Sequence, residues 1–228
     1  MSTRRVNLNT ESVDNYLKAI LALGGPEEER VTGTALAERI GVAPASITNM
    51  LQKLAASPIP LVEYEPRRGV RLSAAGKRRA LEILRHHRLL ETFLYEVLDY
   101  PLEEIHDEAE RLEHFISERF EESIDAKLGR PRFDPHGHCI PALDGKLPKQ
   151  TSRSLADIER NGEFVVDSVS DQDAALLKKL KAGGIVPCAR IHVIRSPQDE
   201  FVLQARNGTK PLRLSRSAIT AIRIRSKN

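Results

Sequence analysis

The hydrophobic pattern of this chain changes its period once, at a segment rich in glycine and proline. Up to residue 128, apolar side chains recur at the spacing of amphipathic helices. From residue 162 they form short runs with the length of β-strands. Regular structure is broken between these parts by Gly129, Pro131, Pro135, Gly137, Pro141, Gly145 and Pro148. The chain is therefore expected to be mainly α with a small β domain at its C-terminal end.

The residue pattern of the helical part predicts three short helices, a hairpin and two long helices. The short helices are expected over 11–24, 34–40 and from 43 or 44 to 54, where Pro44 suits a first helical turn. Two strands within 61–73 would place Arg67 and Arg68 at the tip of a hairpin. The long helices are expected over 74–98, capped by Ser73, and over 102–128. Five strands and a short helix over 171–181 then fit a small barrel, so we place domains at 1–73, 74–150 and 151–228.

The composition of the chain indicates the cellular compartment of the protein, and the distribution of its charged residues indicates what it binds. No apolar run reaches 18 residues, the N-terminus has no apolar signal core, and two cysteines make no disulfide framework, so a cytoplasmic protein without a membrane partner is expected. Lysine and arginine number 12 against 8 acids in residues 1–80, 9 against 16 in 81–150, and 14 against 8 in 151–228. Six of the seven histidines lie in the acidic middle part. Basic ends suit a polyanion, and an acidic, histidine-rich middle suits a cation.

Residues 31–73 form the pattern of a winged helix-turn-helix. In this geometry the second helix enters the major groove of DNA and the first crosses the backbone. Short polar groups on the second helix can reach base edges, and the arginines of the hairpin can contact phosphates. The candidate DNA-binding residues are Pro44, Ala45, Ser46, Thr48, Asn49, Lys53, Arg67 and Arg68.

Residues 85–138 carry the pattern of a metal site. His106, Glu110, Glu113 and His114 are spaced so that one helix over 102–128 would present all four on one face. His87 and Glu91 form an i, i+4 pair on the preceding helix, and Asp134 and His136 lie in the Gly/Pro-rich segment. Imidazole and carboxylate ligands without a thiolate suit Mn²⁺ or Fe²⁺. A solvated charged helix face is the alternative interpretation.

The segments H87RLLE91 and H106DEAERLEH114, placed after a winged helix-turn-helix, resemble the diphtheria-toxin-repressor family of iron- and manganese-dependent regulators. The resemblance extends over almost the whole chain and implies that the C-terminal barrel is SH3-like. It implies a homodimeric repressor of metal-uptake genes that binds palindromic, double-stranded operator DNA. Dimer and core packing would come from Leu90, Phe93, Leu94, Leu112, Phe115 and Ile116.

The resemblance also implies two metal sites per subunit. The primary site would use Glu110, Glu113, His114 and a residue of the first helix. Asn15 aligns with that last position, where the family usually has Met or Asp, and Asp14 is the alternative. A carboxylate at Glu110, where the iron-sensing members have Cys, favours Mn²⁺, and Fe²⁺ is a second ion able to bind.

The second, ancillary site implied by the resemblance would use His87, Glu91 and His106. Manganese-type members take further ligands from a loop that resembles D134PHGH138, usually with Cys where this chain has Asp134. From this loop the candidates are Asp134 and His136, and Asp171 of the barrel would complete the set.

Two other functions fit parts of the pattern. Carboxylates and histidines on a helix could hold a hydrolytic metal, but the chain has no Ser or Cys nucleophile constellation, no Gly-rich phosphate loop and no HExxH motif. The other is a metal-independent winged-helix regulator that senses a different ligand. We therefore expect no enzyme activity.

Overall fold

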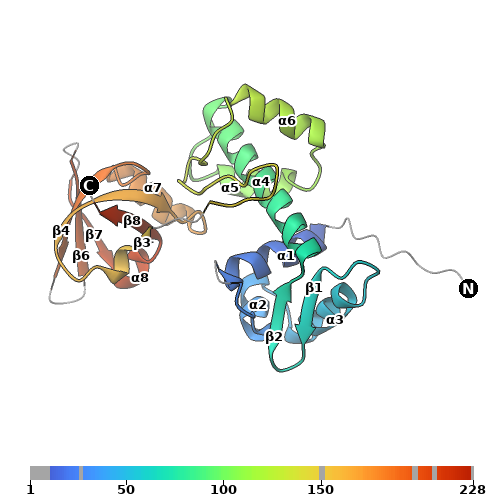
Figure 1. The fold of residues 1–228 in the computed structure, drawn as a ribbon. Coiled ribbons are helices and arrows are strands. Elements are labelled where there is room, and N and C mark those ends of the chain that lie inside the picture. Colours follow the sequence, from blue (N-terminus) through green and yellow to red (C-terminus); the bar gives the residue numbers. More distant parts are fainter. Residues whose placement is uncertain (1–10, 26–27, 149–151, 197–199, 207–209, 227–228) are drawn as a thin grey trace, which may run out of the picture. The chain divides into compact units, whose positions relative to one another are not determined.

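The computed structural model describes residues 11–25, 28–148, 152–196, 200–206 and 210–226, which fall into two compact units (Figure 1). The N-terminal unit holds residues up to 86 together with 113–115 and 141–147. The C-terminal unit holds residues 87–112, 116–140 and those from 148 onward. No helix in the described ranges combines the length and apolar character needed to cross a membrane.

The described residues of the N-terminal unit up to Leu72 form three helices and a two-stranded hairpin, as expected. The helices are α1 (Glu11–Gly24), α2 (Gly33–Ile40) and α3 (Pro44–Ala55), and the hairpin pairs β1 (Val62–Glu65) with β2 (Gly69–Leu72) in antiparallel register. Thr32 caps α2 by accepting a hydrogen bond from the Ala35 amide, and Gly41 ends α2 in the left-handed conformation. The buried stripes of the three helices and the inner face of the hairpin share one core, which includes Leu17, Leu36, Ile47, Leu51 and Val70.

Gly69 lets the chain preceding α2 pack against the hairpin. Val31 and Val70 exchange backbone hydrogen bonds of 2.8 and 2.9 Å. Gly69 has φ 94°, and a Cβ on it would lie 2.4 Å from the Val31 carbonyl oxygen. This position therefore requires glycine, and the close contact anchors the hairpin near its turn.

The helices that follow are α4 (Ala74–Glu96), α5 (Ile105–Leu112) and α6 (Glu118–Lys127). Ser73 caps α4 as expected, since its hydroxyl accepts from the Gly76 amide at 3.1 Å. Residues 74–86 of α4 belong to the N-terminal unit, and the rest of the helix belongs to the C-terminal unit. In that second unit, Leu89, Leu94, Ile105, Ala109 and Ile124 join α4, α5 and α6 in one apolar core.

The predicted single helix over 102–128 is wrong, because it is interrupted between Leu112 and Glu118. Ser117 starts α6 by accepting a hydrogen bond from the Phe120 amide at 3.3 Å. Glu113 and His114 therefore lie beyond the end of α5, and they do not share a helix face with His106 and Glu110. A serine followed by Glu118 is a start signal for a new helix that the apolar spacing concealed.

The β part is an antiparallel sheet of six strands in the order β3-β8-β4-β5-β6-β7. The strands are β3 (Arg153–Ser154), β4 (Gly162–Val169), β5 (Arg190–Arg195), β6 (Glu200–Ala205), β7 (Leu212–Ser215) and β8 (Ile222–Ser226). The short segments η1 (Leu155–Asp157), α7 (Ala174–Ala182) and α8 (Arg216–Ile219) accompany the sheet, whose core centres on the fully buried Phe201. Five strands were expected, and β3 was missed because two residues are too few to show an alternating pattern.

Candidate metal centre and nucleic-acid interface

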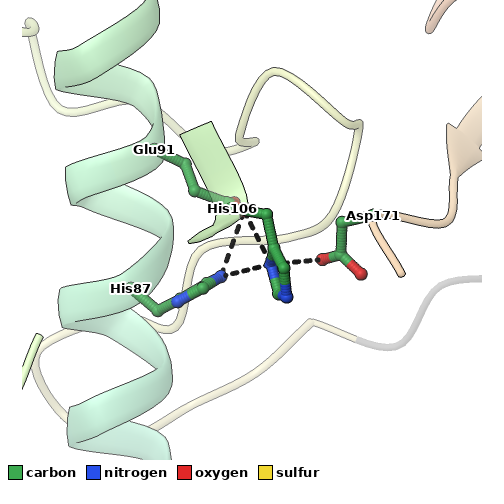
Figure 2. A group of neighbouring side chains, drawn as sticks. All are labelled: His87, Glu91, His106 and Asp171. Carbon is green, nitrogen blue, oxygen red and sulfur yellow. Dashed lines mark hydrogen bonds and ion pairs between the residues drawn. The ribbon is translucent and has the colours of Figure 1, made fainter. Parts of the chain in front are cut away.

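Glu91 belongs to a group of neighbouring candidate ligand side chains in the C-terminal unit (Figure 2). Its Oε1 atom is 3.0 Å from His87 Nε2 and 3.4 Å from His106 Nδ1. The two imidazole nitrogens are 3.2 Å apart, and Asp171 Oδ2 lies 3.7 Å from His106 Nδ1. We call these four residues, from α4, α5 and the loop after β4, the Glu91 cluster.

The distances within the Glu91 cluster match the donor set of a divalent cation. A cation with bonds of about 2.1 Å holds neighbouring ligands of an octahedron roughly 3 Å apart. Two imidazole nitrogens that face each other at 3.2 Å repel through their lone pairs unless a proton or a cation lies between them. Because Glu91 is fully buried and His87 nearly so, the negative charge of Glu91 needs a positive partner at this place.

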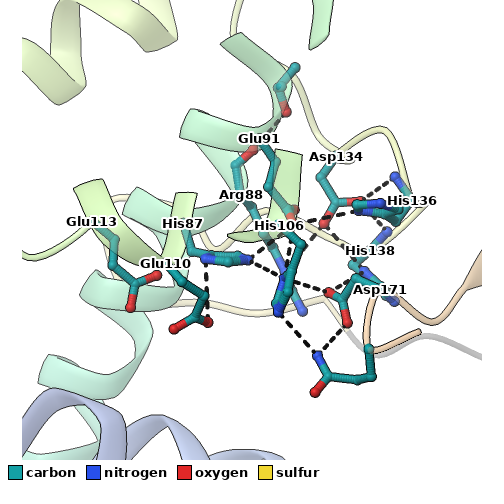
Figure 3. Close-up of polar contacts among 12 residues, drawn as sticks. His87, Arg88, Glu91, His106, Glu110, Glu113, Asp134, His136, His138 and Asp171 are labelled. Atoms are coloured by element: carbon teal, nitrogen blue, oxygen red, sulfur yellow. Dashed lines mark hydrogen bonds and ion pairs between the residues drawn. The ribbon is translucent and has the colours of Figure 1, made fainter. Parts of the chain in front are cut away.

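The loop after α6 brings two more histidines to the Glu91 cluster (Figure 3). His136 Nδ1 is 3.5 Å from Glu91 Oε1, and His138 Nδ1 is 4.0 Å from Asp171 Oδ2. The loop lies directly on β4, since the Val169 amide donates to the His136 carbonyl at 2.9 Å. Gly137 has φ 89°, and a Cβ on it would stand 2.2 Å from the Asp167 carbonyl oxygen. Only glycine fits here, so Gly137 sets the position of both histidines.

Asp134 shapes this loop. Its Oδ1 accepts hydrogen bonds from the amides of His136 and His138, both at 2.9 Å. Its Oδ2 faces Arg88 Nε at 3.5 Å and His138 Nδ1 at 3.4 Å. Asp134 is thus committed to holding the turn with one oxygen, and its other oxygen is the only one left for a cation. Its role as a metal ligand stays a prediction.

Several buried atoms of this region lack a hydrogen-bond partner among the described residues. They include Glu91 Oε2, His136 Nδ1 and His138 Nδ1. Burial alone would raise the pKa of Glu91, but the imidazoles of His87, His106 and His136 outweigh burial and hold that pKa well below its usual range. Glu91 is therefore a carboxylate at neutral pH. Imidazole nitrogens that face carboxylates but make no hydrogen bond within the described residues suit a cation site.

A second polar group lies in the N-terminal unit, between α1 and residues 113–114. Asp14 Oδ2 is 3.3 Å from His114 Nδ1, and Asp14 Oδ1 accepts a hydrogen bond from Arg79 at 2.6 Å. Burial would raise the pKa of Asp14, but the hydrogen bonds from His114 and Arg79 outweigh it and lower that pKa. Beside Asp14, Asn15 has a buried Oδ1 atom without a hydrogen-bond partner among the described residues. Asp14 and Asn15 thus both remain candidates for the ligand from the first helix.

Lys18, one turn further along α1, was not singled out from the sequence. Its ammonium group lies 2.7 and 2.9 Å from the two carboxylate oxygens of Glu113, which is fully buried. Its i, i+4 spacing from Asp14 is a signal that the sequence contains, because it puts both charged side chains on one face of the helix. His86 also contacts this group, with its Nδ1 atom 3.2 Å from the Glu113 carbonyl oxygen.

The residues expected at the primary site are divided between the two units. Asn15, Glu113 and His114 belong to the N-terminal unit, whereas Glu110 belongs to the C-terminal unit. Within its own unit, Glu110 Oε1 lies 3.7 Å from His87 Nδ1. His87 therefore faces Glu91 with one ring nitrogen and Glu110 with the other. The four-residue primary site remains a prediction.

The residues expected to contact DNA are all exposed on α3 and the hairpin. On the helix these are Pro44, Ala45, Ser46, Thr48, Asn49 and Lys53, while Ile47, Leu51 and Leu54 of the same helix are buried. At the hairpin tip, Arg67 adopts φ 69°, and Arg68 pairs with Glu65 at 2.8 Å. Arg30 and Arg71 contact the acidic residues of the hairpin, Glu65 and Glu63 respectively, so the hairpin keeps an excess of positive charge. α3 therefore presents a polar face next to a basic hairpin.

Models of three protein families match successive parts of the chain. Residues 9–70 match the N-terminal DNA-binding domain of iron-dependent repressors, and residues 73–142 match their metal-binding and dimerisation domain. Residues 153–226 match the FeoA domain, which agrees with the expected SH3-like fold.

Relatives and solved structures agree with these matches. The iron-dependent repressor IdeR of Mycobacterium leprae is 30% identical over 208 residues, which cover 85% of this chain and 88% of the relative. The diphtheria toxin repressor of Corynebacterium jeikeium is 31% identical over 66% of this chain and 61% of its own length. A manganese-dependent transcriptional repressor solved with manganese is 36% identical with a TM-score of 0.85, over 94% of this chain and 99% of that one. ScaR with bound Zn²⁺ is 29% identical with a TM-score of 0.78, over the same shares. On this similarity along almost its whole length, the chain belongs to the diphtheria-toxin-repressor family of metal-dependent transcriptional repressors.

Proposed function

We propose that this protein is a Mn²⁺-dependent transcriptional repressor of metal-uptake genes, with Fe²⁺ as a second ion able to bind. The observation that carries the proposal is the convergence of Glu91 with the ring nitrogens of His87 and His106 at 3.0 and 3.4 Å. The family consists of transcriptional repressors and not of enzymes, so the metallohydrolase interpretation is set aside. As a regulator of DNA, the protein would act in the cytoplasm.

We propose two metal sites per subunit. The Glu91 cluster, with His136 and Asp134, would form the ancillary site. Three of its buried atoms, Glu91 Oε2, Asp134 Oδ2 and His136 Nδ1, make no hydrogen bond within the described residues, which fits this role. The primary site would take Glu110, Glu113, His114 and an oxygen of α1, for which the unpartnered Oδ1 of Asn15 is the first candidate and Asp14 the second. A bound dication would offset the repulsion between carboxylates that come from separate helices and would let them lie close together.

The proposal of Mn²⁺ rests on the kinds of ligand atom. Carboxylate oxygens and imidazole nitrogens accept the harder, weakly binding ions of the divalent series, and no thiol is among the candidate ligands. The solved relative with 36% identity supports this choice, because it was obtained with manganese.

The proposed DNA complex contains a homodimer on a palindromic operator. Residues 1–73 would bind DNA, 74–150 would bind metal and dimerise, and 151–228 would form the barrel that supplies Asp171. Leu112 and Phe115 support a dimer, since 37% and 77% of their surfaces are exposed although both are apolar. Leu90 and Leu94, in contrast, are buried within the subunit. A two-fold dimer presents two copies of α3 to two half-sites.

Adding Mn²⁺ is expected to raise the affinity for the operator at least tenfold, about 1.4 kcal/mol of coupling between the two ligands. The reason is that the proposed metal sites take side chains from both the N-terminal unit, which would bind DNA, and the C-terminal unit. Metal binding is therefore expected to favour the arrangement of the two units that binds DNA. The measurement is a DNA shift titration in chelator and in Mn²⁺, paired with equilibrium dialysis of Mn²⁺. Equal DNA affinity in both conditions would favour the metal-independent regulator.

Arg67→Ala and Arg68→Ala are expected to weaken binding to every DNA sequence and to lower the salt slope by roughly one unit per lost phosphate contact. Both side chains are exposed at the hairpin tip. Asn49→Ala, on the exposed face of α3, should instead reduce discrimination between operator and random DNA. Binding curves at several salt concentrations measure both effects. A full salt slope in the arginine variants would mean that the hairpin does not contact phosphate.

A further inference from the structure

We propose that Lys18 is an internal cation that neutralises Glu113 in the metal-free protein and that a metal ion must displace. Lys18 would thereby set the metal concentration at which the protein responds. The inference rests on the proposed function, because it takes Glu113 as a ligand of the primary site.

The contact is specific in its geometry. The Lys18 ammonium lies 2.7 and 2.9 Å from the two oxygens of Glu113, so it bridges the carboxylate as a small cation would. The Glu113 side chain is fully buried, and that of Lys18 is 14% exposed. A buried carboxylate is costly without a positive partner, and Lys18 supplies one at the place where a metal would otherwise be needed.

The ion pairs of this group form without a metal. Asp14 pairs with Arg79, and Glu113 pairs with Lys18 and has its Oε1 atom 3.3 Å from His114 Nε2. A dication bound to Glu113 with Lys18 still in place would bring two like charges onto one carboxylate. Lysine has a flexible four-carbon stem and a strongly hydrated end group, so moving its ammonium to water is the least costly adjustment.

The contacts of Asp14 and Glu113 indicate that Lys18, and not Arg79, is the cation that a metal displaces. Arg79 donates to Asp14 at 2.6 Å through Nε, and Asp14 also contacts His114. Asp14 can therefore remain paired with Arg79 while Glu113 exchanges Lys18 for the metal. Asn15, which is uncharged, adds no negative charge that would allow both cations to stay. Lys18 thus competes directly with the metal and lowers its affinity at this site.

The test is a titration of the Lys18→Met variant with Mn²⁺. Electron paramagnetic resonance measures the free Mn²⁺ at each step, so the number of bound ions is obtained without any DNA readout. We expect at least tenfold tighter binding at one class of site and no change at the other. Lys18→Arg, which retains the cation, should stay within threefold of the wild-type protein. Lys77→Met is the matched control, because it removes a lysine of the same unit that pairs with Glu28 at the surface.

A second measurement covers the case in which Lys18→Met folds poorly. Lys18→Gln keeps a hydrogen-bond donor to Glu113 without the charge, and it should show the same tightening together with a larger increase in Tm on adding Mn²⁺. Unchanged or weaker Mn²⁺ binding in a folded Lys18→Gln or Lys18→Met variant would overturn the inference. Absence of Mn²⁺ binding in the wild-type protein would instead contradict the proposed function, so the two failures are distinguishable.

Discussion

Glu91→Gln is expected to weaken Mn²⁺ binding at the ancillary site at least ~100-fold, about 2.7 kcal/mol. Glu91 Oε1 lies within 3.5 Å of ring nitrogens of His87, His106 and His136. Glutamine keeps the shape of the side chain but removes its negative charge. The site would keep its imidazoles and the half-buried Asp171 but lose its fully buried carboxylate, and the loss of a charged ligand has a large effect where the surroundings are of low dielectric constant.

Isothermal titration with Mn²⁺ measures this loss as the disappearance of one class of site. Glu96→Gln is the matched control, because Glu96 lies five residues further along the same helix, α4, and is exposed. The control should bind two ions per chain with wild-type affinity. If Glu91→Gln still bound both ions as tightly as the wild-type protein, the Glu91 cluster would be a structural network of hydrogen bonds and not a metal site.

Gly137→Ala is expected to lower the free energy of unfolding by about 2–4 kcal/mol and to weaken the ancillary site at the same time. The added Cβ would lie 2.2 Å from the Asp167 carbonyl oxygen, and the backbone there has φ 89°. Because the obstacle is backbone of β4, the loop itself must move. His136 and His138 flank Gly137, so their ring nitrogens would leave Glu91 and Asp171.

Gly129→Ala separates the effect of backbone strain from the effect of the contact between the added Cβ and β4. Gly129 also has a positive φ, 72°, but a Cβ on it would meet nothing within 4 Å. It should therefore cost only the backbone strain, about 1 kcal/mol, with metal binding unchanged. Urea unfolding and Mn²⁺ titration of both variants give the comparison. An equal effect of the two substitutions would show that the contact of the loop with β4 has no influence on the site.

Local patterns were sufficient for most elements of the fold. The helices α1, α2 and α3, the hairpin with Arg67 and Arg68, and the Ser73 cap of α4 all lie where they were expected. Each depends on interactions between residues a few positions apart, such as a cap, a helical stripe or a tight turn. The i, i+4 spacing of His87 and Glu91 likewise predicted their contact, because both stand on one uninterrupted helix.

The break after Leu112 shows where local pattern fails. Polar residues continue at helical spacing through this point, but Glu113 pairs with Lys18, 95 residues away, and His114 contacts Asp14, 100 residues away. Spacing along one helix had suggested that Glu113 and His114 share a face with His106, and this was wrong. The role of these residues as ligands stays a prediction, whereas their placement on one helix face was wrong.

The sequence by itself therefore determined the order of the elements and the kinds of ligand atom, since both follow from neighbours within a turn or a strand. Only the tertiary structure decided which of the candidate ligand side chains meet. Glu91 gains His106 and His136 because α5 and the loop at Gly137 pack around α4, and Glu113 gains Lys18 because α1 lies beside it. These contacts join distant segments, whose approach depends on the burial of many apolar side chains at once and leaves no periodic signal in the residues that finally touch.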